Sequence, residues 1–218
     1  MSKTKKAVII GSVLVGIGVI IGFIGIAIGG FKFPNGAVDL TTMKALHAEK
    51  KTVQIADAFD KIEIAGASSM DIEICKSKTG KNYVEYYDTD DWTSRVDVKD
   101  RVLKFTTDDK GKHKAIVSLG FGKDTAARLY LADAEYKEIS VTTLSGYVTI
   151  QDVNAETVNV SASSGDLYMK NINAPDSIMA TSSSGDIDLE NATAKQIELG
   201  ANSGDIEMQD ITAESLRM

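Results

Sequence analysis

The sequence has few of the residues that mark several common classes of protein. It has one cysteine, Cys75, so no disulfide can form within the chain. Two prolines beside eighteen glycines exclude a collagen-like or proline-rich chain. The two histidines, His47 and His113, do not supply the usual ligand set of a zinc site with that single cysteine. We therefore expect no zinc centre and no bound cofactor.

Basic residues are also fewer than acidic residues. The chain has 24 Lys and Arg residues against 31 Asp and Glu residues. Lys3, Lys5 and Lys6 all precede the first apolar stretch, so the remainder keeps 21 basic against 31 acidic residues. Such an acidic body repels phosphate backbones, and we expect no nucleic acid partner.

A long apolar run stands out against this acidic background. Residues 7–31 contain no charge and would form a helix of about 37 Å, long enough to cross a bilayer. The preceding lysines predict a cytoplasmic tail at residues 1–6 and an outward-facing remainder. A cleaved signal peptide is the alternative, but its apolar region has only roughly 7–15 residues. We expect a single-pass bacterial membrane protein with an extracytoplasmic C-terminal domain.

The segments after this run differ in pattern. Residues 32–57 are predicted to be a juxtamembrane spacer with a Pro-Asn-Gly turn and one short helix around residues 43–49. Residues 58–136 alternate apolar and polar positions, as in "KIEIAGASSMDIEI" from Lys61, which predicts an N-terminal β-strand region. No helical period interrupts these strands, so the part after the spacer is predicted to be all-β.

Residues 137–218 repeat one pattern. "SSGDLYMKNI", "SSGDIDLENA" and "NSGDIEMQDI" begin at Ser163, Ser183 and Asn202, and alignment on their glycines gives spacings of 19 or 20 residues. Apolar residues recur two and four positions after each glycine, and Asp or Asn recurs six positions after it. This period predicts a β-solenoid in which each repeat forms one coil, preceded by β-hairpins.

Two polar corners follow from the alignment. The first consists of the pairs Ser145 and Gly146, Ser164 and Gly165, Ser184 and Gly185, and Ser203 and Gly204. Glycine there is expected to permit a positive φ, while the Asp or Asn six residues later closes the second bend by side-chain to backbone hydrogen bonds.

The aspartates that follow the corner glycines are candidates for a cation site. Asp166, Asp186 and Asp205 are expected to point outward and to stack in one column. Hard oxygen ligands would suit a calcium ion. The alternative, which we favour, is that they are solvated turn residues with hydrogen bonds to neighbouring groups.

Catalysis has little support. The repeated serines would need a nearby base, usually histidine, and both histidines precede the repeats. The enzymatic alternative is a surface polysaccharide-active β-helix lyase or hydrolase, but such enzymes build clefts from long loops. We therefore expect no catalytic residues. A possible carbohydrate platform is formed by Tyr83, Tyr86, Tyr87 and Trp92, although aromatics on a strand often pack against neighbours.

The chain resembles the bacterial "putative adhesin" group of domains of unknown function, common in Gram-positive envelopes. The resemblance covers roughly residues 59–218 and rests on "FDKIEI", "SSMDIEI", "YVEYY", "ARLYLADAEYKEISV" and the SGD repeats. Met70 and Tyr147 depart from the usual Gly and Asp of the motif. The resemblance implies a surface β-solenoid linked in some members to adhesion or to responses to envelope damage, without enzymatic activity.

The C-terminal strand is expected to show an open edge. Leu216 and Met218 occupy the columns of Ile197 and Leu199, and no proline or lysine-rich cap follows. Either the chain is a shortened form of a longer protein, or the edge pairs with another chain. The expected partner is a protein, a cell-wall component, or a second copy that associates through this edge.

The predicted topology can be tested on protoplasts. Protease added to intact protoplasts is expected to digest the chain after residue 31, because the lysines before the apolar run hold the N-terminus inside. Immunoblotting of both termini would measure the cleavage, with permeabilised protoplasts as the control. Protection of the C-terminal region in intact protoplasts alone would contradict the outward orientation.

Overall fold

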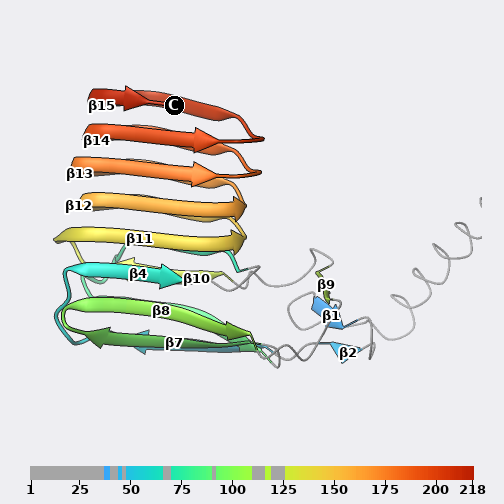
Figure 1. Cartoon of the computed structure of the whole chain (residues 1–218). Coiled ribbons are helices and arrows are strands. Elements are labelled where there is room, and N and C mark those ends of the chain that lie inside the picture. The colour runs from blue at the N-terminus through green and yellow to red at the C-terminus, as the bar shows by residue number, and fades with distance from the viewer. Residues whose placement is uncertain are drawn as a thin grey trace, which may run out of the picture.

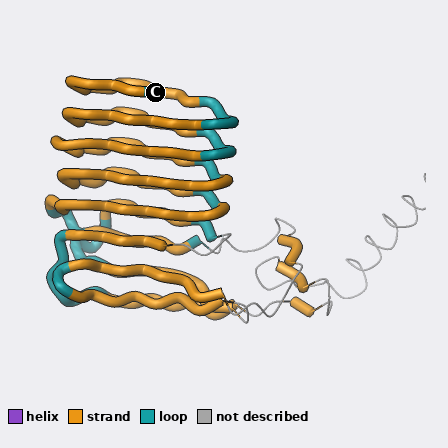
Figure 2. Tube along the Cα trace, viewed as in Figure 1, coloured by secondary structure: helices purple, strands orange, loops and turns teal. Residues whose placement is uncertain are grey.

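The computed structural model describes residues 37–39, 44–45, 48–65, 70–89, 92–109, 116–118 and 126–218. The regular elements in these ranges are all β-strands, drawn in orange in Figure 2, so the all-β prediction is confirmed. Within the same ranges no helix is long and apolar enough to cross a membrane. The predicted cytoplasmic tail and transmembrane helix, residues 1–31, lie outside the described residues.

The strands lengthen toward the C-terminus, where each one covers most of a repeat. In chain order they are β1 (Ala37–Asp39), β2 (Lys44–Ala45), β3 (Ala48–Gln54), β4 (Lys61–Ala65), β5 (Ile72–Lys76), β6 (Tyr83–Thr89), β7 (Trp92–Lys99), β8 (Val102–Asp109), β9 (Ile116–Ser118), β10 (Ala127–Leu131), β11 (Glu135–Ser145), β12 (Val148–Ser164), β13 (Leu167–Ser182), β14 (Ile187–Ala201) and β15 (Ile206–Arg217).

The predicted spacer contributes strands to the fold. β1 pairs with β2 and with β9 in a small antiparallel sheet, and β3 pairs with β6 in the main sheet. The predicted short helix around residues 43–49 is wrong, because Lys44–Ala45 is a strand and β3 begins at Ala48. Val53 of β3 packs against the main core, so its burial outweighs the weak helical pattern of this segment.

The main sheet folds into two faces. Face 1 contains β3, β6, β10 and β5, followed by the opening halves of β12 to β15. Face 2 contains β7, β8, β4 and β11, followed by the closing halves of the same four strands. Figure 1 shows the layers from β11 to β15 as a regular stack. Each repeat therefore crosses both faces before the next coil begins.

Successive coils pair in parallel, residue over equivalent residue. Ile150 pairs with Met169, Met169 with Leu189, and Leu189 with Met208, which are the columns that the sequence alignment predicts. The extra residue of the second repeat produces a register shift between Ala174 and Ser177. The shift is confined to a bend, so the apolar columns stay in register on both sides of it.

The stack begins well before residue 137. β4 pairs in parallel with β11, and β5 pairs in parallel with β12, so these two short strands form a coil below the repeats. β8 still pairs in parallel with β4 beneath these strands, and the pairing becomes antiparallel in the β7–β8 hairpin. Asp100 and Arg101, with φ of 52° and 64°, form its tight turn. The predicted hairpins thus pack directly under the coils.

The core is a narrow slab between the two faces. Its columns contain fully buried side chains, among them Ile178, Ile187 and Ile197, each 0% exposed. Burial of one such side chain stabilises the fold by roughly 1.5–3 kcal/mol. An apolar void of about 10 Å³ lies among Ile62, Leu103 and their neighbours, which leaves no room for a small-molecule ligand.

The two faces of a strand predict opposite effects of neighbouring substitutions. Ile187→Asp would bury a charge in a continuous apolar column, and we expect a loss of at least about 4 kcal/mol in the free energy of unfolding. Asp188→Asn, one residue away on the exposed side, should change it by less than about 0.5 kcal/mol. Urea denaturation measures both. Equal losses would contradict the assignment of faces.

Candidate interaction site

The repeated glycines form one corner of the coil stack. Of Gly146, Gly165, Gly185 and Gly204, only Gly146 has a positive φ, at 141°. The other three do not adopt the positive φ that glycine was expected to permit in this column. A Cβ atom on any of those three would overlap the carbonyl oxygen of the glycine one coil below. Glycine is required because backbone stacks directly on backbone at this corner.

The serines before these glycines lie at the surface. Ser164, Ser184 and Ser203 are exposed, and Ser145 is half-buried. Both histidines lie outside the described residues, so the described part of the chain places no imidazole beside these serines. The hydroxyl bond found at this corner comes from Ser182, which donates to the carbonyl oxygen of Gly165 at 3.1 Å. Its role is to connect neighbouring coils.

The aspartate column forms a hydrogen-bond ladder. The Asp166 carboxylate accepts the backbone N–H of Asp186 at 2.9 Å, and the Asp186 carboxylate accepts that of Asp205 at 2.8 Å. In the lowest coil Asp71 accepts the N–H of Tyr147 at 2.9 Å. Within the described ranges no group of three or more His, Cys, Asp and Glu side chains is arranged to hold a metal ion. The column binds each coil to the next.

The second corner contains a different ladder. Asp152, Asn171, Asn191 and Asp210 all have a φ between 51° and 55°, which Asp and Asn tolerate better than other non-glycine residues. The side-chain amide of Asn171 donates to Asp152 Oδ1 at 2.6 Å, and that of Asn191 donates to Asn171 Oδ1 at 2.7 Å. The predicted side-chain to backbone bonds are thus replaced by side-chain bonds between coils.

The tyrosines do not form one platform. The predicted set consists of Tyr83, Tyr86, Tyr87 and Trp92. Tyr86 is 5% exposed and contacts Phe105 edge-on inside the core, with ring centroids 5.7 Å apart. Tyr83 lies on the opposite side of β6, where its ring stacks on Tyr130 at 4.4 Å. The mutual stack covers one face of each of these two rings, and the Trp92 side chain lies outside the described residues.

Charged side chains on face 1 pair between coils. Lys170 Nζ lies 2.7 Å and 2.8 Å from the two oxygens of Glu190, and the Tyr168 hydroxyl donates to Glu190 at 3.1 Å. The hydrogen bond from Lys170 lowers the pKa of Glu190, and the same bond raises the pKa of Lys170. Both shifts lead away from neutral pH, so this pair is not suited to acid–base catalysis.

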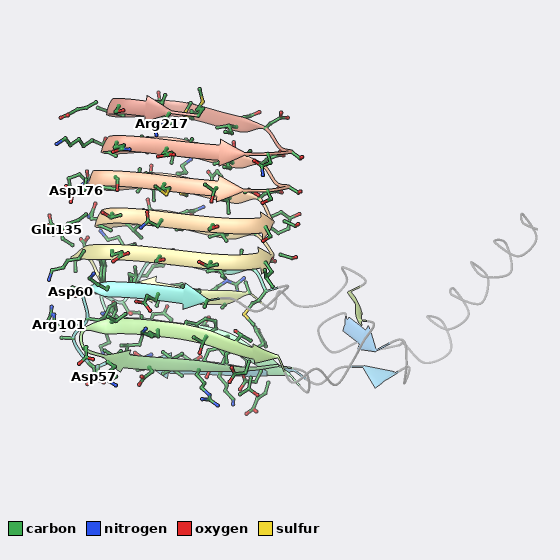
Figure 3. The ribbon with its side chains drawn as sticks, in the orientation of Figure 1. Asp57, Asp60, Arg101, Glu135, Asp176 and Arg217 are labelled. Carbon is green, nitrogen blue, oxygen red and sulfur yellow. The ribbon has the colours of Figure 1, made fainter. Side chains whose placement is uncertain are left out.

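A second cluster connects the lower layers. Asp60 Oδ2 lies 2.9 Å from Lys137 Nζ and accepts a hydrogen bond from Arg101 Nε at 3.1 Å. Asp60 and Arg101 lie at neighbouring layers in Figure 3. Lys137 and then Arg101 lower the pKa of the Asp60 carboxyl. This carboxylate is therefore a structural anion that connects β8, β4 and β11.

The stacked coils correspond to a known family. The family model named Toastrack DUF4097 matches residues 59–218. The chain belongs to this family. The assignment covers the same residues as the predicted resemblance. Among the curated proteins, none matches the chain.

The solved structures that match the Toastrack chain have low identity to it. A "putative cell adhesion protein" from Clostridium sporogenes has 10% identity and a TM-score of 0.48, over 75% of this chain and 99% of that chain. A "putative adhesin" from Bacteroides fragilis has 12% identity and a TM-score of 0.28, over 78% and 96%. A "putative adhesin" from Parabacteroides merdae has 12% identity and a TM-score of 0.25, over 78% and 95%.

The predicted open edge of the Toastrack domain is seen at β15. Leu216 is 47% exposed, although Ile197, its equivalent one coil below, is fully buried. Met218 is 72% exposed, and Ile206 and Met208 are only partly buried. Among the described strands β15 pairs with β14 alone. Within the described residues, one rung of the core and one row of backbone groups at β15 are therefore uncovered.

Sequence reasoning missed one polar cluster of the Toastrack domain. Asn82 Oδ1 accepts the backbone N–H of Ala132 at 2.6 Å and the Tyr136 hydroxyl at 3.2 Å. Burial raises the pKa of Tyr136 to about 12, and Asp133 adds to the shift. Asn82 lies 54 residues from Tyr136 in the sequence, outside the repeats, so no periodic signal indicates that they meet. The cluster fastens the turn between β10 and β11.

The stacked glycine corner gives a matched pair of substitutions. Gly185→Ala should cost roughly 2–4 kcal/mol of unfolding free energy, because its Cβ would overlap the Gly165 carbonyl oxygen. A Cβ at Gly200 would lie 3.6 Å from Thr181 Cγ2, an ordinary contact, so Gly200→Ala should be neutral or stabilise by up to about 1 kcal/mol. Thermal and urea unfolding measure the difference. Similar effects of both would show that close stacking is not the reason for the glycine.

Proposed function

We propose that this Toastrack chain is a non-enzymatic interaction module of the bacterial cell envelope. In this proposal the apolar run at residues 7–31 anchors it in the membrane, and the coil stack projects outward as a β-solenoid. The module takes part in adhesion or in sensing envelope stress by binding a protein or a cell-wall component. The lysines before the apolar run support the anchoring, and the predicted resemblance supports the envelope role.

One observation carries the proposal: the repeated polar side chains are engaged between coils. The aspartate ladder uses Asp166 and Asp186 as acceptors of backbone N–H groups, and the second ladder joins Asn171 to Asn191. A catalytic group instead needs a free functional atom beside a bound substrate. Because these side chains form hydrogen bonds between coils, they favour the role of a rigid scaffold with extended binding faces.

The electrostatics and the core agree with this proposal. Hydrogen bonds lower the pKa values of Glu190 and Asp60, the opposite of the shift that a general acid near neutral pH requires. The apolar void of about 10 Å³ would not hold a substrate. Among the described residues, no cleft lined with acidic side chains supports a polysaccharide-active enzyme, and we do not adopt that alternative.

Crosslinking in intact cells tests the proposal. A photoreactive amino acid would replace Asp188 on face 1, Thr193 on face 2, or Glu214 near the open edge, all of which are exposed. We expect a defined crosslinked product from neighbouring positions of one face, and its loss when several outward residues of that face are changed together. Lys195, at an exposed bend, provides a control position.

An enzyme would behave differently in the same cells. It would lose turnover of a surface polysaccharide after a single acid is replaced, with the rest of the face unchanged. Such a result, or crosslinks that are spread evenly over all positions, would refute the interaction module.

A further inference from the structure

The uppermost coil that the structure describes displays carboxylate acceptors that receive no hydrogen bond from a coil above. In the coils below, the carboxylates of Asp166 and Asp186 each accept a backbone N–H from the coil above. Asp205 holds the same position directly before β15, and no described residue donates to its carboxylate. Asp210 is the equivalent of Asn191 in this coil. Its carboxylate accepts a hydrogen bond from Gln209 Nε2 at 3.4 Å and has no N–H to donate. This edge can therefore accept hydrogen bonds from the donor groups of another chain.

The same edge is acidic on face 1. Asp205 directly before β15, and Glu207 and Asp210 within it, are exposed, and Asp188 lies below Glu207 on β14. The nearest cation along this face, Lys170, is already paired with Glu190. Residues 137–218 hold 13 Asp and Glu against 4 Lys and Arg. Two copies that met through this edge would bring like charges together.

Between these acids the edge is apolar and open. Ile206 and Met208 are partly buried, whereas their equivalents Ile187 and Leu189 are 0% and 2% exposed under the coil above. The backbone groups of residues 206–209 on the side away from β14 have no strand beside them among the described residues. An extended segment that placed apolar side chains over Ile206 and Met208 would close the core column.

We propose that the face 1 edge of β15 binds a cationic, extended segment of a partner protein by strand addition. Apolar side chains of the segment cover Ile206 and Met208, and its alternate Lys or Arg side chains lie beside Glu207, Asp205 and Asp210. The segment ends before the glycine corner or carries glycine there, because a side chain stacked on Gly204 would repeat the overlap found below it. This inference rests on the proposed function as an interaction module.

Synthetic peptides test the pairing on the full chain in mild detergent. The probes are an eight-residue peptide that alternates valine with lysine, its valine–glutamate counterpart, and a valine–lysine peptide with alternate backbone nitrogens methylated. By fluorescence anisotropy we expect the valine–lysine peptide to bind at least tenfold more tightly than either of the others. Its binding should weaken several-fold when the salt concentration rises from 50 to 300 mM.

Charge variants locate the site. Glu207→Lys should weaken the valine–lysine peptide at least tenfold and let the valine–glutamate peptide bind. Asp176→Lys makes the same charge change at an exposed bend below the edge, labelled in Figure 3, and should leave binding within twofold. Leu216→Asp on face 2 should also leave it within twofold. Circular dichroism would confirm that each variant is folded.

Four results would overturn the inference. Equal binding of the methylated peptide would show that charge alone attracts the segment. Equal effects of Glu207→Lys and Asp176→Lys would place the site elsewhere. Sedimentation as a dimer that Leu216→Asp dissociates would make a second copy the occupant of the edge. If none of the peptides binds while crosslinks from Asp188 or Thr193 persist in cells, the strand-addition inference is wrong and the proposed function stands.

Discussion

The structure depends on one constraint: each residue of a coil must lie directly over its equivalent in the coil below. Because parallel strands lie about 4.8 Å apart, the backbone at the corners must stack as closely as the backbone of the strands. At the first corner the backbone of Gly185 stacks on the carbonyl of Gly165, with no volume for a Cβ. At the second corner Asn171 and Asn191 turn with a left-handed φ. Together these corners keep the repeat at 19 or 20 residues.

Stacking of like over like also determines the chemistry of the surface. Equivalent carboxylates such as Asp166 and Asp186 would repel if they faced one another, but each accepts a backbone N–H from the next coil instead. Asn171 both donates and accepts within its ladder. The motif therefore has a structural use, which agrees with the proposed role as a scaffold whose edge and faces meet other molecules.

Much of this arrangement could be predicted, and the exceptions have physical reasons. The columns that contain Ile150, Met169 and Leu189 follow from a period that only stacking explains. The helix expected near residue 44 failed because β3 is held by pairing with β6, a contact between distant segments. The predicted aromatic set does not share one face, because alternation along β6 sends Tyr86 inward and Tyr83 outward, where it stacks on Tyr130.

By itself the sequence determined the all-β class, the coil period, the buried columns and the positions of both corners, because each is written locally and repeated. Only the tertiary structure decided why the corners need their residues: Gly185 is required by a carbonyl one coil away, and Asp186 by a backbone N–H above it. The junction of Asn82 with Tyr136 was likewise decided by the fold. Such contacts join residues whose separation in sequence carries no signal, because they exist only after the coils have stacked.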